Sequence, residues 1–123
     1  MKRMVIEAWW LIFECGCLMR LGGFHRLHSA VGNQGVVGSR GREESVYLCR
    51  AVDLACVFYF KRVLCLQRSA AAAVLLRRHG WNAVLVIGAN LMPFQSHEWV
   101  EVDGCVVNDK PYMKEMFREL ARC

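Results

Sequence analysis

The sequence predicts a single α+β domain, and three observations lead to this prediction. Residues 4–21, 43–60 and 65–79 carry apolar side chains at helical spacing. Residues 83–87 are a short apolar run with β-branched side chains, which indicates a buried strand. Two further strands follow, at residues 97–101 and 105–109, on either side of a turn-forming Asp-Gly pair. Helices followed by an antiparallel meander are typical of the α+β class, and 123 residues leave room for one domain.

The N-terminal helix is expected to be apolar nearly all round. Glu7 and Glu14 form its one narrow polar stripe. Such a helix is either buried in the core or docked on a partner. Its aromatic side chains Trp9, Trp10 and Phe13 are the candidates for binding a partner.

Glycines are expected to end this helix. A glycine pair at positions 22–23 follows it, and residues 30–42 contain a glycine at every third position, which predicts a flexible loop. Residues 1–42 would therefore form the N-terminal helix and a Gly-rich loop. Residues 43–123 would form the remaining helices and the sheet.

The third helix is expected to begin at Cys65, and Gly80 ends it. A last amphipathic helix is expected at residues 112–122. Its inward-facing side chains would be Met113, Met116, Phe117 and Leu120.

Composition excludes several classes of protein. A hydrophobic fraction of 55% and a mean hydropathy of +0.22 are too high for a disordered chain. Seven cysteines are an odd number and too few for a disulfide scaffold, so we expect reduced thiols and a cytoplasmic location. The net charge of +5 is scattered, without a basic stripe for nucleic acid. The apolar run near the N-terminus is too short to span a membrane, so membrane contact is not expected.

A cysteine, a histidine and an aspartate form the candidate catalytic group. Cys65 is the cysteine at the predicted start of a helix, where the thiolate is favoured. His97 opens one strand of the hairpin and Asp109 closes the other. A two-residue turn would place these two side chains on opposite faces of the sheet. A three-residue loop, with Gly104 left-handed, would place them directly opposite each other, and we predict this second register.

Metal binding is the competing interpretation. Cys15, Cys17, His25 and His28 supply the right ligand types. The two cysteines are two positions apart on a predicted helix and point to different faces, whereas zinc sites usually place such a pair in a turn. We therefore expect no metal site and no cofactor.

Several short elements together resemble the lasso-peptide leader peptidases, the transglutaminase-like protease domains of the lasso maturation B protein. The resemblance covers residues 58–111 strongly. It is carried by Cys65-Leu66-Gln67-Arg68-Ser69, Leu75-Leu76-Arg77-Arg78-His79-Gly80, Ala83-Val84-Leu85-Val86-Ile87-Gly88, Pro93-Phe94, His97-Glu98-Trp99-Val100-Glu101, Asp103-Gly104 and Val107-Asn108-Asp109.

This resemblance implies a papain/transglutaminase-like fold and a cysteine peptidase. Cys65 would be the nucleophile, His97 the general base and acid, and Asp109 the residue that orients the imidazole. The enzyme would release the leader from a lasso-peptide precursor. As a split, protease-only form it would depend on a separate PqqD-like leader-binding protein, and a lasso cyclase resembling asparagine synthetase would act next.

Two neighbours of the histidine are candidate substrate-binding residues. Glu98 departs from the family, which usually has a small residue there, and it could raise the pKa of His97 or contact the partner. Trp99 would be a wall of the site or part of the core. Two other functions stay open, namely acyl transfer by the same fold (transglutaminase or acetyltransferase-like) and a non-catalytic scaffold that binds a leader peptide.

Overall fold

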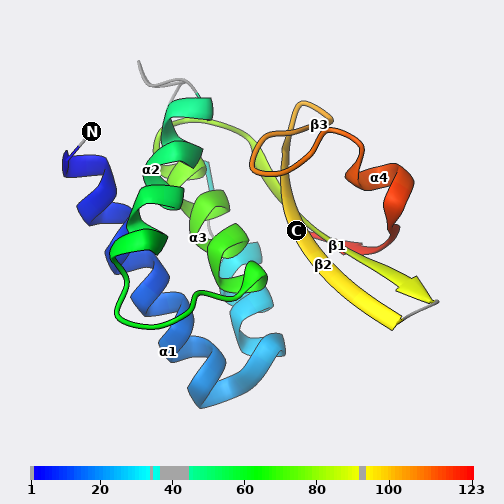
Figure 1. The fold of residues 1–123 in the computed structure, drawn as a ribbon, viewed down its shortest axis with the longest axis horizontal. Helices are drawn as coiled ribbons and strands as arrows, with labels where there is room; N and C mark the ends of the chain where they lie inside the picture. The colour runs from blue at the N-terminus through cyan, green and yellow to red at the C-terminus, as the bar shows by residue number, and fades with distance from the viewer. Residues whose placement is uncertain (1, 34, 37–44, 92–93) are drawn as a thin grey trace.

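The computed structural model describes residues 2–33, 35–36, 45–91 and 94–123, and it confirms the α+β class. Three helices come first and an antiparallel sheet follows (Figure 1). The strand order is β3-β2-β1-β4. The elements are α1 (Lys2–Gly32), α2 (Ser45–Phe58), α3 (Cys65–Arg78), β1 (Ala83–Leu91), β2 (Phe94–Val102), β3 (Cys105–Val106), α4 (Met113–Met116) and β4 (Arg118–Arg122).

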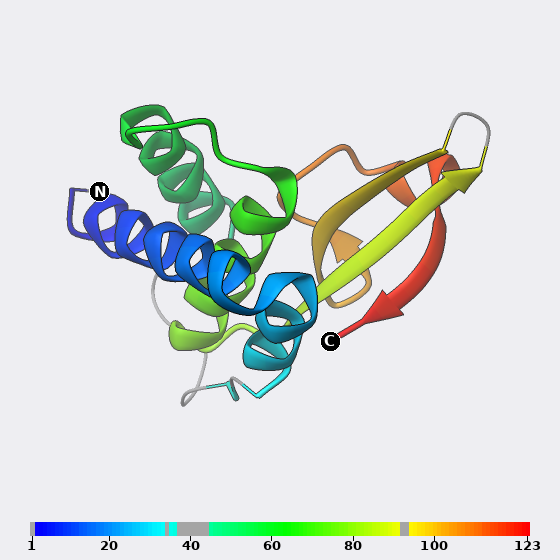
Figure 2. The same ribbon diagram turned by 90° about the horizontal axis from the view of Figure 1, so that it is seen from below.

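Helix α3 is the central element of the fold. It packs on α1 and α2 on one side and on β1 and β2 on the other (Figure 2). Residues 70–73 are four consecutive alanines, each at most 1% exposed, and their small side chains let neighbouring elements approach closely. Leu85 and Val100 complete the core from the facing side of the sheet. The third helix, predicted at residues 65–79, is thus confirmed.

The opposite face of the sheet has a smaller core of its own. Val86, Trp99 and Met113 are buried there, with Phe117 packed against them. Gly88 lies beneath the Trp99 ring, where a Cβ atom would come within 2.6 Å of the indole. This close approach requires glycine at that position of β1.

Arg77 ties three distant parts of the chain together. Its side chain donates hydrogen bonds to the carbonyl oxygens of Ala83 (2.8 Å), Val31 (2.6 Å) and Cys123 (2.7 Å). The residue is 7% exposed, and burial lowers the pKa of its guanidinium. It therefore joins the end of α1, the start of β1 and the C-terminal residue.

The prediction that glycines end the first helix at residue 21 is wrong. Gly23 takes a positive φ of 67°, which kinks α1, and the helix then continues to Gly32. Leu27 and Val31 in this second part are 0% and 1% exposed, so packing in the core sustains the helix after the kink. Of the predicted loop at 30–42, residues 30–32 are helical, and residues 34 and 37–42 lie outside the described ranges.

The predicted helix at residues 112–122 is also wrong. Only Met113–Met116 are helical, and the chain then extends into β4, which pairs with β1. Met113 is buried, whereas Met116 and Leu120 are 48% and 64% exposed. The open edge of β1 offers backbone hydrogen bonds that a short helix would leave unmade. None of the helices in the described part of the chain has the length and apolarity needed to cross a membrane.

Candidate active site

Cys65 is the first residue of α3. The residue before it, Leu64, is extended (φ −77°, ψ 155°), so the helix begins sharply at the cysteine. The first backbone N–H groups of a helix have no partner within the helix, and they give this end a partial positive charge. The half-buried Cys65 thiol therefore lies where an anion is favoured.

The hairpin after β2 has a two-residue turn, so the predicted three-residue loop is wrong. Val102 pairs with Cys105, whereas the prediction paired Glu101 with Cys105. Asp103 and Gly104 both have positive φ values, 52° and 80°. These values are typical of a type I′ turn, whose twist matches that of the flanking strands.

His97 and Asp109 nevertheless meet. A regular continuation of the ladder would send their side chains to opposite faces, but β3 ends after two residues. The Val100 N–H donates instead to the side-chain oxygen of Asn108 at 2.7 Å. The chain leaves the sheet there, and His97 Nε2 lies 2.6 Å from Asp109 Oδ2.

The Asp109 carboxylate is held in its charged form. Burial works against the charge, but the hydrogen bonds from His97 and from the Lys110 N–H, with the nearby Arg68 charge, lower the pKa of Asp109 below its ordinary value. The His97 ring also stacks on the ring of Phe117, with the two ring centroids 5.6 Å apart. The imidazole is thus fixed by one carboxylate and one aromatic ring.

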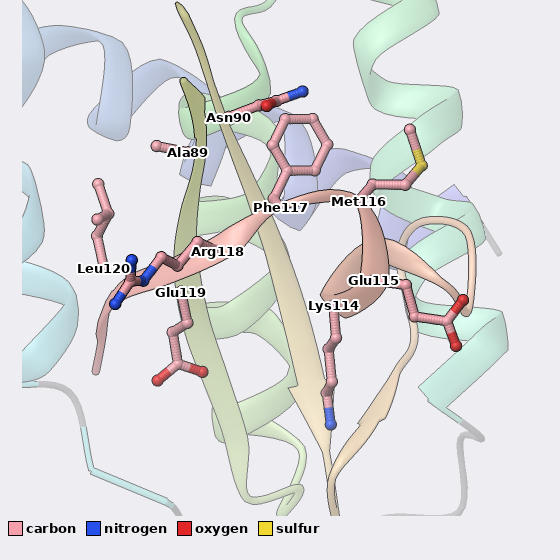
Figure 3. Close-up of a pocket in the computed structure, with 9 residues that line it drawn as sticks. All are labelled: Ala89, Asn90, Lys114, Glu115, Met116, Phe117, Arg118, Glu119 and Leu120. Atoms are coloured by element: carbon pink, nitrogen blue, oxygen red, sulfur yellow. The ribbon is translucent and has the colours of Figure 1, made fainter. Parts of the chain in front are cut away.

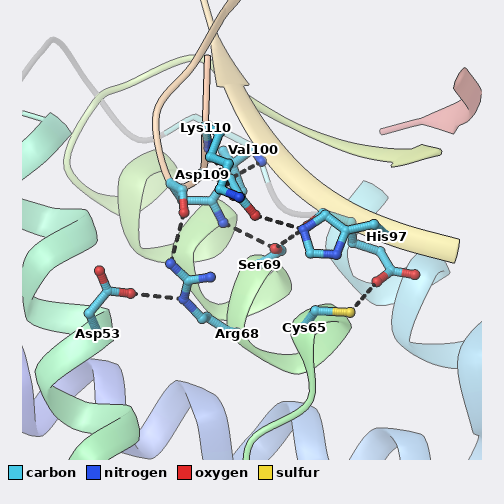
Figure 4. A network of polar contacts seen from close by, with 10 residues as sticks. Asp53, Cys65, Arg68, Ser69, His97, Val100, Asp109 and Lys110 are labelled. Atoms are coloured by element: carbon cyan, nitrogen blue, oxygen red, sulfur yellow. Dashed lines mark hydrogen bonds and ion pairs between the residues drawn. The ribbon is translucent and has the colours of Figure 1, made fainter. Parts of the chain in front are cut away.

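A polar network fastens this segment to α3 (Figure 4). Arg68 donates to the Asn108 carbonyl oxygen at 2.8 Å and pairs with Asp53 at 2.8 Å. The Asn108 amide donates to Ser69 Oγ at 3.0 Å, and Ser69 donates to the Glu98 carbonyl oxygen at 2.9 Å. Sequence reasoning gave Asp53, Arg68, Ser69 and Asn108 no role. Positions 68 and 69 lie three and four residues after the cysteine, and this helical spacing was the available signal.

The hydrogen bond of the Cys65 thiol goes to Glu98. Cys65 Sγ lies 2.8 Å from Glu98 Oε2. Burial, this hydrogen bond and the charge of Glu98 raise the pKa of Cys65 to about 11, although the backbone N–H groups of Glu98 and Leu66 act in the opposite direction. In this state the cysteine is a protonated thiol.

The profile of the transglutaminase-like superfamily matches residues 8–122. This chain belongs to the transglutaminase-like superfamily. The Escherichia coli microcin J25-processing protein McjB is 44% identical to it over 57 residues, which are 46% of this chain and 27% of McjB. The chain thus matches about a quarter of the length of that relative. No solved structure matches the chain significantly.

In this transglutaminase-like domain, Trp99 is a core residue. It is fully buried, and its indole N–H donates to Glu101 Oε2 at 2.9 Å. No surface of the ring is available to a substrate, so its position favours the core over the predicted substrate-binding role.

The predicted partner-binding residues lie on an exposed aromatic surface, which consists of Trp9, Trp10, Phe13, Phe58 and Phe60. Trp10, Phe58 and Phe60 are 55%, 71% and 66% exposed. Trp9 contacts Trp10, Phe13 and Phe60 through its ring. The residues of this surface belong to α1 and to the C-terminal end of α2 with the segment that follows it.

A hollow of about 790 Å³ lies along β1, α4 and β4, on the side of the sheet away from α3 (Figure 3). It is lined by both charged and apolar side chains and contains none of the candidate catalytic residues. Phe117 lines it and also stacks on His97, so the hollow lies beside the candidate site. Within the described ranges, no group of three His, Cys, Asp or Glu side chains is placed to hold a metal ion.

Proposed function

We propose that this chain is a cysteine peptidase that hydrolyses the bond between leader and core in a ribosomally made lasso-peptide precursor. The observation that carries the proposal is the position of Cys65, at the start of α3, with its thiol bonded to Glu98 of β2, the residue that follows the His97 held by Asp109. The name of McjB, a microcin J25-processing protein, supports a peptide precursor as the substrate.

Acylation is the first step of the proposed reaction. His97 Nε2 is engaged by Asp109, which leaves Nδ1 to take the proton of Cys65. The thiolate attacks the scissile carbonyl carbon and forms a C–S bond, and the N–H of Cys65 stabilises the oxyanion. His97 then returns the proton to the amide nitrogen as the C–N bond breaks. A thioester and a free amine result.

Deacylation completes the cycle. His97 takes a proton from water, and the hydroxide attacks the thioester carbonyl. The C–S bond breaks, a carboxylic acid leaves, and the proton on His97 restores the Cys65 thiol. Water is the one co-reactant of this cycle, so we propose no cofactor.

The aromatic surface is our proposed docking site for a separate PqqD-like leader-binding protein, and a lasso cyclase resembling asparagine synthetase would act after cleavage. Exposed apolar patches of this kind mark interaction sites. Replacing Trp10 and Phe58 together by serine should weaken binding of the partner at least about tenfold in calorimetry. Leu21→Ser is the matched control, since Leu21 is 78% exposed on α1 but lies outside the aromatic surface. Equal losses in both variants would contradict the proposed docking site.

The peptidase proposal is tested with a short precursor peptide encoded next to the gene of this chain. The peptide is incubated with the protein, with and without the leader-binding partner, and products are identified by mass spectrometry. We expect cleavage by the wild type and none by Cys65→Ala. Cys56→Ala is the control, because Cys56 lies in α2 and its removal should cost only a little stability.

The products distinguish the alternatives. Cleavage by Cys65→Ala at the wild-type rate would refute the proposal. Transfer of the acyl group to an added amine would indicate an acyltransferase of the same fold. Binding of the precursor without cleavage would indicate a scaffold.

A further inference from the structure

Glu98 is a buried carboxylate beside the candidate nucleophile, and none of the described residues forms an ion pair with it. The residue is 6% exposed, and its Oε2 accepts the hydrogen bond from Cys65 at 2.8 Å. No ion pair within the described part of the chain includes it. The other buried acid of β2, Glu101, differs in having Lys114 at 3.4 Å and Arg122 at 3.7 Å. Of the two buried acids of β2, Glu101 thus has nearby cations and Glu98 has none among the described residues.

An unpaired buried carboxylate is unfavourable, because it loses its hydration without gaining a counter-charge. The hydroxyl of Ser69 holds the backbone carbonyl of Glu98 at 2.9 Å, so the strand is fixed against α3 at this point. The carboxylate is thus kept next to the thiol. Within the described residues it therefore lacks the cation that would offset its burial.

We propose that Glu98 determines substrate specificity by binding a lysine or arginine side chain on the residue whose carbonyl Cys65 attacks. This inference rests on the proposed peptidase function. Acylation bonds the carbonyl carbon of that residue directly to Sγ, and Sγ lies 2.8 Å from Glu98 Oε2. The Cα of the residue is then two bonds from Sγ, so a long cationic side chain on it reaches the carboxylate.

Binding of the cation also releases the thiol. While Glu98 is unpaired, its negative charge and its hydrogen bond keep the proton on Cys65. A substrate cation neutralises that charge and competes for the same carboxylate oxygen. The thiol is then free to give its proton to His97. A basic substrate residue is therefore bound and activates the nucleophile in one event.

The test uses three chloromethyl ketones that share a benzyloxycarbonyl cap and carry a lysine, norleucine or glutamate side chain. The Cys65 thiolate displaces chloride and forms a thioether, so no precursor peptide is needed. The rate at each cysteine is measured by mass spectrometry of the digested protein, with the exposed Cys105 as the internal reference. We expect the lysine reagent to modify Cys65 about tenfold faster than the norleucine reagent, and the glutamate reagent to be slowest.

Variants assign this preference to Glu98. Glu98→Gln keeps the shape and removes the charge, and it should reduce the preference for lysine to less than about twofold. Glu98→Ala is a second variant with the same expected result, and circular dichroism establishes that each variant is folded. Glu14→Gln removes the same charge from an exposed position on α1 and should keep the wild-type preference.

Two results would overturn the inference. Equal rates of the lysine and norleucine reagents at Cys65 of the wild type would do so without any variant, and cleavage of the precursor would still support the peptidase. A folded Glu98 variant that keeps the full preference for the lysine reagent would also refute the inference. If none of the three reagents modifies Cys65 while Cys105 reacts, the inference and the proposed nucleophile fail together.

Discussion

Replacing Glu98 by glutamine should make Cys65 a more reactive thiol. In the native protein, burial and the contact with Glu98 raise the pKa of Cys65 to about 11, against an ordinary value of 9.0. Glutamine has the same shape without the charge, and its amide can donate a hydrogen bond to the thiolate. We therefore expect the pKa of Cys65 to fall in the variant, and burial to keep it above 9.0.

The size of the effect follows from these two values. At pH 7.5 a pKa of about 11 in place of 9.0 leaves about a hundredfold less thiolate, since each pH unit changes the ratio tenfold. Glu98 supplies two of the three causes that raise the pKa. The thiolate fraction of Cys65 should therefore be about tenfold higher in the variant than in the native protein. The contacts of His97, Asp109 and Arg68 do not involve the side chain that is replaced.

The assay is the rate of alkylation of Cys65 by iodoacetamide, followed by mass spectrometry between pH 6 and 11. The rate depends on the thiolate fraction, so the midpoint of the profile reports the pKa of Cys65. Glu14→Gln should leave the profile unchanged. Cys49, which is buried with a pKa of about 12, should stay protected in every folded variant. An unchanged midpoint in Glu98→Gln, with Cys49 protected, would refute the electrostatic reasoning.

Four further predictions concern stability and catalysis. Arg77→Met should lower the free energy of unfolding in urea by about 3–5 kcal/mol, since it removes three hydrogen bonds to carbonyl oxygens, two of them buried. The neighbouring Arg78→Met should cost less than about 1 kcal/mol, since Arg78 is 42% exposed. Gly88→Ala should cost about 1–3 kcal/mol through its clash with the buried indole, and Gly35→Ala, which meets open space, should be nearly neutral in the same urea assay. Asp109→Asn should slow precursor cleavage about 10²–10⁴-fold. Because the pKa of Asp109 is lowered by folding, its contribution to stability is present at neutral pH and is lost as the pH falls through its folded pKa, which urea titrations at several pH values would show.

Local sequence patterns predicted the elements whose structure depends on local interactions. The apolar spacing and the alanine run of α3, and the β-branched run of β1, predicted those elements at their observed starts, Cys65 and Ala83. The elements predicted wrongly depend on distant parts of the chain. Leu27 lies beyond the kink of α1 and is sustained by the core, and the residues of β4 are extended because β1 has a free edge.

The contact between His97 and Asp109 was predicted for the wrong reason. Strand alternation with the observed two-residue turn would separate the two side chains. They meet because the amide of Asn108 takes the Val100 N–H and ends the ladder. An asparagine within a strand pattern was the local signal of this break, since its short polar side chain competes with backbone pairing.

In the proposed mechanism two neighbouring residues of β2, His97 and Glu98, both act on Cys65, and the same break in the ladder bears on how they do so. Alternation turns Glu98 toward the face that packs on α3, where Cys65 lies, and turns His97 to the other face. Because β3 ends opposite Glu101, no strand of the described ranges pairs with residues 97–99 of β2 on that side, and Asp109 holds the His97 ring at this edge. The acid therefore contacts the thiol through the sheet face, and the histidine must approach it around the edge. In such an arrangement the resting partner of Cys65 is the carboxylate, and a change that removes its charge favours transfer of the proton to His97.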